Sequence, residues 1–217
     1  MDVFTQQERD EGMDAYWNDC GLRVDATLRI NYCGSDGSPT ERTIDVTHFA
    51  DDMIRAHCRL RNEIRTFRAD RIMSCVDVIT GHETDDALEY LYDLYKQTPD
   101  YSYQNVLTEH LDILRALLYV TEYSGFSEAQ RVAIICNLCR KLSNDSRIST
   151  RMVAPTVVQY QRASFTSFKQ TIGRLSKSLS PKNQASLLRM ATKAATSIEP
   201  TNKFSQEALD YMAKRFG

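Results

Sequence analysis

The chain has 217 residues, of which 42% are hydrophobic and 26% are charged, a composition typical of folded globular proteins. It excludes an intrinsically disordered chain, and no apolar run reaches the roughly 18 residues that cross a bilayer. The first eight residues also lack the pattern of an export signal, so we expect a cytoplasmic protein with no membrane partner, built as two modest domains or one large one.

The formal net charge is −2, but charges of one sign are grouped along the chain. Residues 1–20 contain six acids and one arginine, and residues 77–112 contain nine acids and one lysine. Between them, residues 55–71 carry six arginines and two acids, and after Cys139 fourteen basic residues face four acidic ones. Blocks of opposite sign either pair inside the fold or attract a charged partner.

The first part of the chain shows the alternating pattern of β-strands. Residues 5–20 have loosely helical spacing and predict a short acidic helix, and a turn is expected at residues 34–39. Strands are predicted at residues 22–32, 41–46, 53–60, 63–68 and 72–80, with Asn62 and Asp70 in the breaks. Five short strands joined by tight turns indicate a small twisted sheet or barrel.

The hydrophobic period becomes helical after Gly81. A helix capped by Thr84 or Asp85 should end before Pro99, and residues 97–105 are expected to be a linker. Further helices are predicted at residues 107–123, 127–143, 150–161, 164–178, 182–197 and 205–216, and the expected N-caps are Ser127, Ser164, Ser180 and Ser205. The predicted divisions are an acidic segment (1–21), a β-barrel (22–81), a helix with linker (82–105) and a helical domain (106–217).

The six cysteines are expected to be reduced, mostly buried packing residues, because they are spread too thinly for a disulfide scaffold. Cys136 and Cys139 are spaced so that they could share a zinc ion or a redox bond. Zinc would need two more ligands from a second Cys or His pair, which the sequence lacks, and a redox pair normally begins a helix. We therefore expect core packing, with no metal and no cofactor.

The arginine-rich run at residues 61–68 is the most specific chemical feature. In a strand, Arg65 and Phe67 would share one face, and a guanidinium beside an aromatic ring suits a phosphate with a stacked base. Equally, the arginines could pair with the acidic blocks and lie solvated along an edge strand, which charged residues often protect. The residues alone leave both interpretations open.

Residues 56–72 resemble the latter part of the WYL domain family, which has a cysteine, a leucine-arginine, an arginine-x-phenylalanine and an aspartate-arginine-isoleucine in this order and spacing. Ile30-Asn31-Tyr32 and Arg42 match its early strands, whereas Asp52-Met53-Ile54 replaces its aromatic signature. The resemblance, over residues 26–79, implies an Sm-like, SH3-type five-stranded barrel that binds a nucleotide, a nucleic-acid segment or another anion and signals to an attached domain. It implies that the anion is held by Arg61, Arg65 and Arg71, with Tyr32, His57 and Phe67 as shape-reading neighbours.

The rear half resembles TerB-like domains of tellurite resistance. Residues 111–130 follow that family's helix, glycine turn and helix, and residues 207–217 resemble its last helix. Ser124 and Gln130 stand where the family usually has an aspartate and a glutamate, so its acidic or metal site is not carried over. What the resemblance implies is a helical interaction module.

We therefore expect an α+β protein, a barrel followed by an all-helical domain, that acts as a non-enzymatic, bacterial-type ligand sensor. Its predicted ligand is a nucleotide or single-stranded nucleic acid, and a protein partner or a second copy is also possible. The alternative is an adaptor without a small ligand that docks an acidic partner through its basic helical half. A hydrolase using the acidic helix at residues 85–93 is the weakest hypothesis, because no nucleophile, paired-carboxylate or phosphate-loop motif is present.

Overall fold

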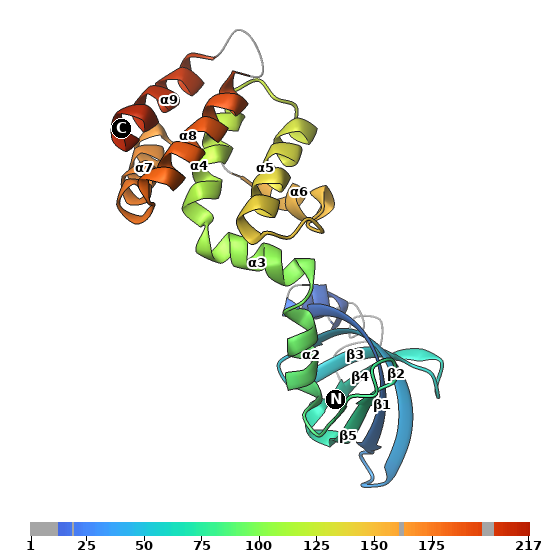
Figure 1. Ribbon diagram of the computed structural model, residues 1–217. Helices are drawn as coiled ribbons and strands as arrows, with labels where there is room; N and C mark the ends of the chain where they lie inside the picture. The colour runs from blue at the N-terminus through green and yellow to red at the C-terminus, as the bar shows by residue number, and fades with distance from the viewer. Residues whose placement is uncertain (1–12, 19, 161–162, 197–201) are drawn as a thin grey trace. The chain divides into compact units, whose positions relative to one another are not determined.

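A computed structural model describes residues 13–18, 20–160, 163–196 and 202–217. The chain divides into two compact units, and the boundary in the sequence falls between Thr98 and Pro99. The first unit, which we call the sheet unit, contains all the described strands, and the second, which we call the helical unit, contains helices α3 to α9 (Figure 1). Among the described residues, no helix has both the length and the apolar character needed to span a membrane.

The sheet unit is built on a six-stranded antiparallel sheet with the order β4-β3-β2-β1-β5-β6. The strands are β1 (Leu22–Cys33), β2 (Pro39–Ala50), β3 (Met53–Cys58), β4 (Glu63–Arg68), β5 (Ile72–Asp77) and β6 (Glu83–Thr84). The predicted five-stranded Sm-like or SH3-type barrel is wrong, because the sheet is open. In the described part of the chain β5 pairs with β1, and β4 pairs only with β3, so the outer edge of β4 has no neighbouring strand.

Alternation places one face of the sheet in a hydrophobic core. In β1 the side chains of Val24, Ala26, Leu28, Ile30 and Tyr32 are all buried and their neighbours are more exposed. The core face is covered by α2 (Ala87–Tyr95), which lies against the sheet in Figure 1 and buries three residues of its own on that side. The expected period of two in the first strand is therefore confirmed.

Two local predictions in the sheet unit are corrected. The third strand was expected to reach Leu60 but ends at Cys58, because the chain turns there with Asn62 in the left-handed region at φ 54°. The N-cap of α2 is Asp86, whose carboxylate accepts a hydrogen bond from the Glu89 backbone N–H, and not Thr84 or Asp85. Of the acidic helix expected at residues 5–20, residues 13–18 are helical, and residues 1–12 lie outside the described part of the chain.

The helical unit begins in the segment that was expected to be a linker. Residues 97–105 are not a linker, because α3 starts at Pro99, a residue suited to the first helical turn, and buries Tyr103 and Val106. The helices are α3 (Pro99–Glu109), α4 (Leu111–Glu122), α5 (Glu128–Ser143), α6 (Thr150–Val158), α7 (Phe165–Ser178), α8 (Pro181–Ala195) and α9 (Lys203–Phe216). They enclose one hydrophobic core in which α4 is the most buried helix (Figure 1).

Serine caps define three of these helices as expected. The hydroxyls of Ser127, Ser164 and Ser180 each accept a backbone N–H from three residues onward. The expected cap at Ser205 is wrong: Asn202 caps α9, and Ser205 is fully buried inside that helix. Its hydroxyl lies 3.2 Å from the Ser124 hydroxyl, so it joins α9 to the end of α4.

The cysteine prediction is confirmed for four of the six residues. Cys58, Cys75, Cys136 and Cys139 are buried, and all six thiols are free. Burial raises the pKa of the Cys139 thiol to about 12, so this thiol stays protonated at neutral pH. Cys20 is exposed and Cys33 is partly exposed, because both stand at the ends of elements rather than on a core face.

Candidate functional site

The six predicted ligand-binding residues come from five places in the sheet unit. They are Tyr32 in β1, His57 in β3, Arg61 in the turn before β4, Arg65 and Phe67 in β4, and Arg71 in the short 3-10 turn after β4. Tyr32 and Phe67 meet in an edge-to-face ring contact with centroids 5.3 Å apart. His57 lies on the opposite face, because its neighbours Ala56 and Cys58 both point into the core.

The aromatic pair is part of the core and does not offer an open stacking surface. Phe67 is 1% exposed and Tyr32 is 8% exposed. The Tyr32 hydroxyl accepts the Arg68 backbone N–H at 3.4 Å, and the Arg42 guanidinium carbon lies 5.3 Å from the Tyr32 ring centre. These contacts fix the end of β1 to β4, so the predicted use of Phe67 for base stacking is wrong.

Several arginines of residues 55–71 are already paired with the chain's own carboxylates. Arg59 makes two hydrogen bonds to Asp45, and Arg68 makes two to Asp70. Each guanidinium lowers the pKa of its partner carboxyl, and the hydrogen bond is the largest cause in both cases. The second of the two initial interpretations, arginines paired along an edge strand, therefore holds for these two residues.

The three arginines predicted to hold an anion are less strongly paired with carboxylates than Arg59 and Arg68 are. The Arg65 Nε atom lies 3.6 Å from Glu63 Oε1, which is an ion pair rather than a hydrogen bond. Among the described residues, neither Arg61 nor Arg71 forms an ion pair. Arg61 precedes β4 and Arg71 follows it in the 3-10 turn, so the three side chains start from well-separated points of the backbone.

An open hollow of about 400 Å³ lies beside Arg65, between the helix at residues 13–18 and strands β3 and β4. Arg55 and Arg65 supply its positive charges, and Asp14 supplies a negative one and forms an ion pair with Arg55. The other lining residues are Met13, Trp17, Ile64 and Thr66. The hollow therefore combines two guanidinium groups with an apolar surface.

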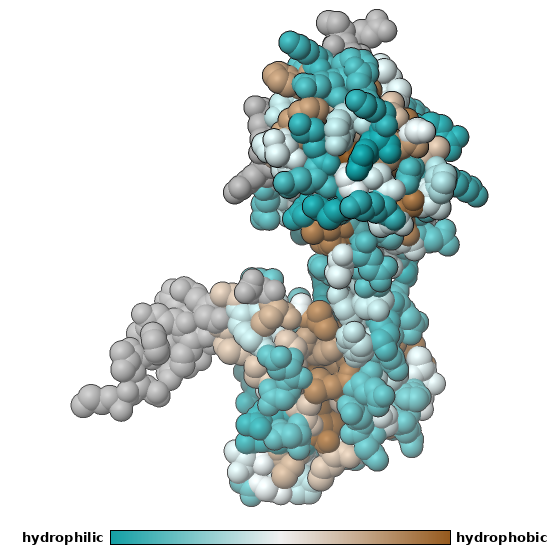
Figure 2. Space-filling view, turned by 90° about the vertical axis from the view of Figure 1, so that its left-hand side faces the viewer, coloured by the Kyte–Doolittle hydropathy of each residue, from teal (hydrophilic) through white to brown (hydrophobic). Residues whose placement is uncertain are grey.

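The apolar part of the hollow is accessible to solvent. Ile64 is 63% exposed and Met13 is 37% exposed, whereas Trp17 is 2% exposed and holds the helix against the sheet. Figure 2 shows that apolar side chains reach the surface on the visible face of the sheet unit. The hollow thus places exposed apolar side chains beside two guanidinium groups, which makes it the candidate binding surface of the sheet unit.

Sequence reasoning identified Arg65 but missed most of this hollow. In the sequence, Arg55 stands out only as one of the six arginines of residues 55–71. Arg55 lies opposite Thr66 and shares a sheet face with Thr66 and Ile64, whereas Arg65 starts on the other face and reaches the hollow because β4 is an edge strand. The chain's single tryptophan, Trp17, falls in the acidic segment that was expected to be helical. This was the sequence feature that could have pointed to Met13, Asp14 and Trp17 as part of a site.

No arrangement typical of a metal centre occurs in the described ranges. Among those residues, no three His, Cys, Asp or Glu side chains are grouped so that they could hold a metal ion. Cys136 and Cys139 are 1% and 0% exposed in α5, as core packing requires.

Comparisons with known proteins leave the family undetermined. No family model matches the chain, and no curated protein matches it. Among solved structures, "The crystal structure of Anabaena CcbP" matches with 19% identity over 44% of this chain and 79% of that chain, at a TM-score of 0.22. The resemblances to the WYL domain and TerB-like families stay predictions.

Proposed function

We propose that this chain is a non-enzymatic binding protein whose sheet unit takes an anionic ligand, a nucleotide or a short single strand of nucleic acid, in the hollow beside Arg65. The observation that carries this proposal is that Arg55 and Arg65, from adjacent strands, line one hollow together with exposed Ile64 and Met13. Arg55 pairs with Thr66 and Arg65 pairs with Ala56, so the two arginines start one register position apart on opposite faces of the sheet, and both side chains reach the hollow at the edge strand β4.

The chemistry of the hollow fits a phosphate joined to a flat apolar group. A guanidinium can bind two phosphate oxygens at once, and the side chains of Met13 and Ile64 offer a surface for a base. The lining residues comprise two arginines and one aspartate, so their charge favours an anion. A phosphate would take the place of the Asp14 carboxylate on Arg55.

This exchange gives the proposal a test with two opposite expected effects. Binding of fluorescein-labelled oligothymidylate and of ATP is measured by anisotropy and by calorimetry. Arg65→Ala should weaken binding by about 1 to 3 kcal/mol, as lost phosphate contacts generally do. Asp14→Asn should tighten binding, because it removes the carboxylate that competes for Arg55.

Arg29→Ala is the matched control, since Arg29 is an exposed arginine of β1 that does not line the hollow. It should leave the affinity unchanged. Binding should also weaken as salt is added, because phosphate contacts release counterions. Salt-insensitive binding, or equal effects of Arg65→Ala and Arg29→Ala, would rule the proposal out.

A further inference from the structure

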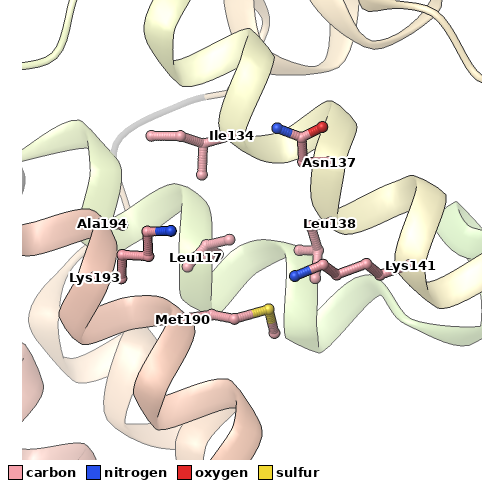
Figure 3. Close-up of a pocket in the computed structure, with 8 residues that line it drawn as sticks. All are labelled: Leu117, Ile134, Asn137, Leu138, Lys141, Met190, Lys193 and Ala194. Carbon is pink, nitrogen blue, oxygen red and sulfur yellow. The ribbon is translucent and has the colours of Figure 1, made fainter.

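A second cavity, of about 210 Å³, opens between α4, α5 and α8 of the helical unit (Figure 3). Its apolar lining comes from all three helices: Leu117 from α4, Leu138 from α5 and Ala194 from α8 are each no more than 5% exposed. Ile134 and Met190 are partly buried and complete the apolar wall. The interior of the cavity therefore favours a hydrocarbon group over a polar one.

The rim of the same cavity is positively charged. Lys141 stands in the last turn of α5 and Lys193 in the last turn of α8, and Figure 3 shows both ammonium groups pointing toward the space between these helices. Lys141 is exposed and forms no ion pair within the part of the chain that the structure describes. Asn137 adds an amide to the rim, and no acidic side chain lines the cavity.

We propose that this cavity binds a small amphiphilic anion, with a short alkyl or similarly compact apolar body and one carboxylate. The apolar body would lie on Leu117, Leu138 and Ala194, and the carboxylate would meet the ammonium groups of Lys141 and Lys193 at the rim. An ion pair beside an apolar wall is less screened than one in open water, so the two contacts support each other.

The size and charge of the cavity select this class of ligand. If each water-sized group, such as a methylene, occupies about 30 Å³, the cavity has room for about seven of them. This volume suits a short alkyl chain better than a drug-sized molecule. A cationic amphiphile of the same length would place its charge against two lysines. A neutral one would leave Lys141 without a counter-charge.

This site is independent of the hollow in the sheet unit, because the two share no residue and belong to different units. Failure of one proposal therefore does not imply failure of the other.

The test uses the full chain with octanoate as the probe, and octylamine and 1-octanol as probes of equal length but different charge. Affinity is measured by titration calorimetry, and contact with the cavity by shifts of the Leu117 and Ile134 methyl signals. Octanoate should bind saturably, octanol more weakly, and octylamine not at all. Lys141→Gln should weaken octanoate about threefold, the size expected for one partly exposed ion pair.

Two further variants make the result decisive. Ile134→Trp places a large ring in the cavity from a partly buried position and should abolish binding, while circular dichroism checks that the fold is kept. Lys177→Gln, at an exposed lysine of α7 outside the cavity, should have no effect. The proposal is overturned if octylamine binds as well as octanoate, if no probe saturates, if Lys177→Gln matches Lys141→Gln, or if folded Ile134→Trp still binds octanoate.

Discussion

The carboxylate of Asp145 should be a main source of stability in the helical unit. It is 9% exposed and accepts four hydrogen bonds: the backbone N–H of Arg147 at 2.9 Å, two guanidinium donors of the same residue at 2.9 and 2.8 Å, and the Ser102 hydroxyl at 2.8 Å. It therefore joins α3 to the loop between α5 and α6.

Asp145→Asn removes the charge and one of the two acceptor oxygens. At about 1 kcal/mol for each hydrogen bond that is lost, the change should lower the free energy of unfolding by about 2 kcal/mol. The guanidinium of Arg147 is 60% exposed, so solvent screens the ion pair and keeps the cost below that of a fully buried one. Urea unfolding followed by circular dichroism measures this difference.

The same variant should show a specific pH dependence. The hydrogen bond from Arg147 is the largest cause that holds the pKa of the Asp145 carboxyl well below its usual range. The contribution of the Asp145 carboxylate to the free energy of unfolding is therefore complete above the unfolded-state pKa of about 3.9. It is lost as the pH falls from there toward the lower folded-state pKa. The stability gap between the natural chain and Asp145→Asn should be largest at neutral pH and should narrow in acid.

Asp210→Asn is the control, because Asp210 is an exposed aspartate of α9 with a single hydrogen bond from Gln206. This change should alter stability by less than about 0.5 kcal/mol. Equal stabilities of the Asp145→Asn and natural chains at neutral pH, or a gap that grows in acid, would refute the reasoning.

Three other outcomes follow from burial and capping. Phe67→Ala should cost about 3 to 5 kcal/mol in urea unfolding, because this ring is a core residue; a loss below 1 kcal/mol would contradict its burial. Cys20 should react with iodoacetamide in the native protein, whereas Cys139 should react only after unfolding, as peptide mass spectrometry can show; early modification of Cys139 would disprove the packing described for α5. Ser127→Ala should cost about 1 kcal/mol, because α5 loses its capping box, and an unchanged melting temperature would argue against that cap.

Local patterns in the sequence predicted the elements well. The period of two in β1, the break at Asn62 and the serines before α5, α7 and α8 each involve residues within a few positions of one another. The failure to predict α3 also has a local cause. The sequence Thr98-Pro99-Asp100 is typical of a turn, yet a proline is also favourable in the first turn of a helix.

The arrangement of the sheet could not be predicted in the same way. The pairing of β5 with β1, which leaves β4 at an edge, joins residues at least forty positions apart, and strand alternation is the same in an open sheet and in a barrel. Alternation placed Arg65 beside Phe67 but could not show that Phe67 would be covered by Tyr32 and Arg42.

The candidate site was partly predictable for a similar reason. The excess of arginine in residues 55–71 was visible in the sequence, but its partners were not, because Asp14 and Asp45 reach Arg55 and Arg59 only through the fold. The hollow depends on the helix at residues 13–18 lying beside β3 and β4, which is another non-local contact.

The most direct test of anion binding at this hollow is a titration of the full chain with ATP, followed through the Nε–Hε signals of its arginines by NMR. The proposal predicts that the signals of Arg55 and Arg65 shift together and saturably, while that of Arg29 stays in place. Unchanged signals for Arg55 and Arg65, or shifts of equal size at Arg29, would contradict it.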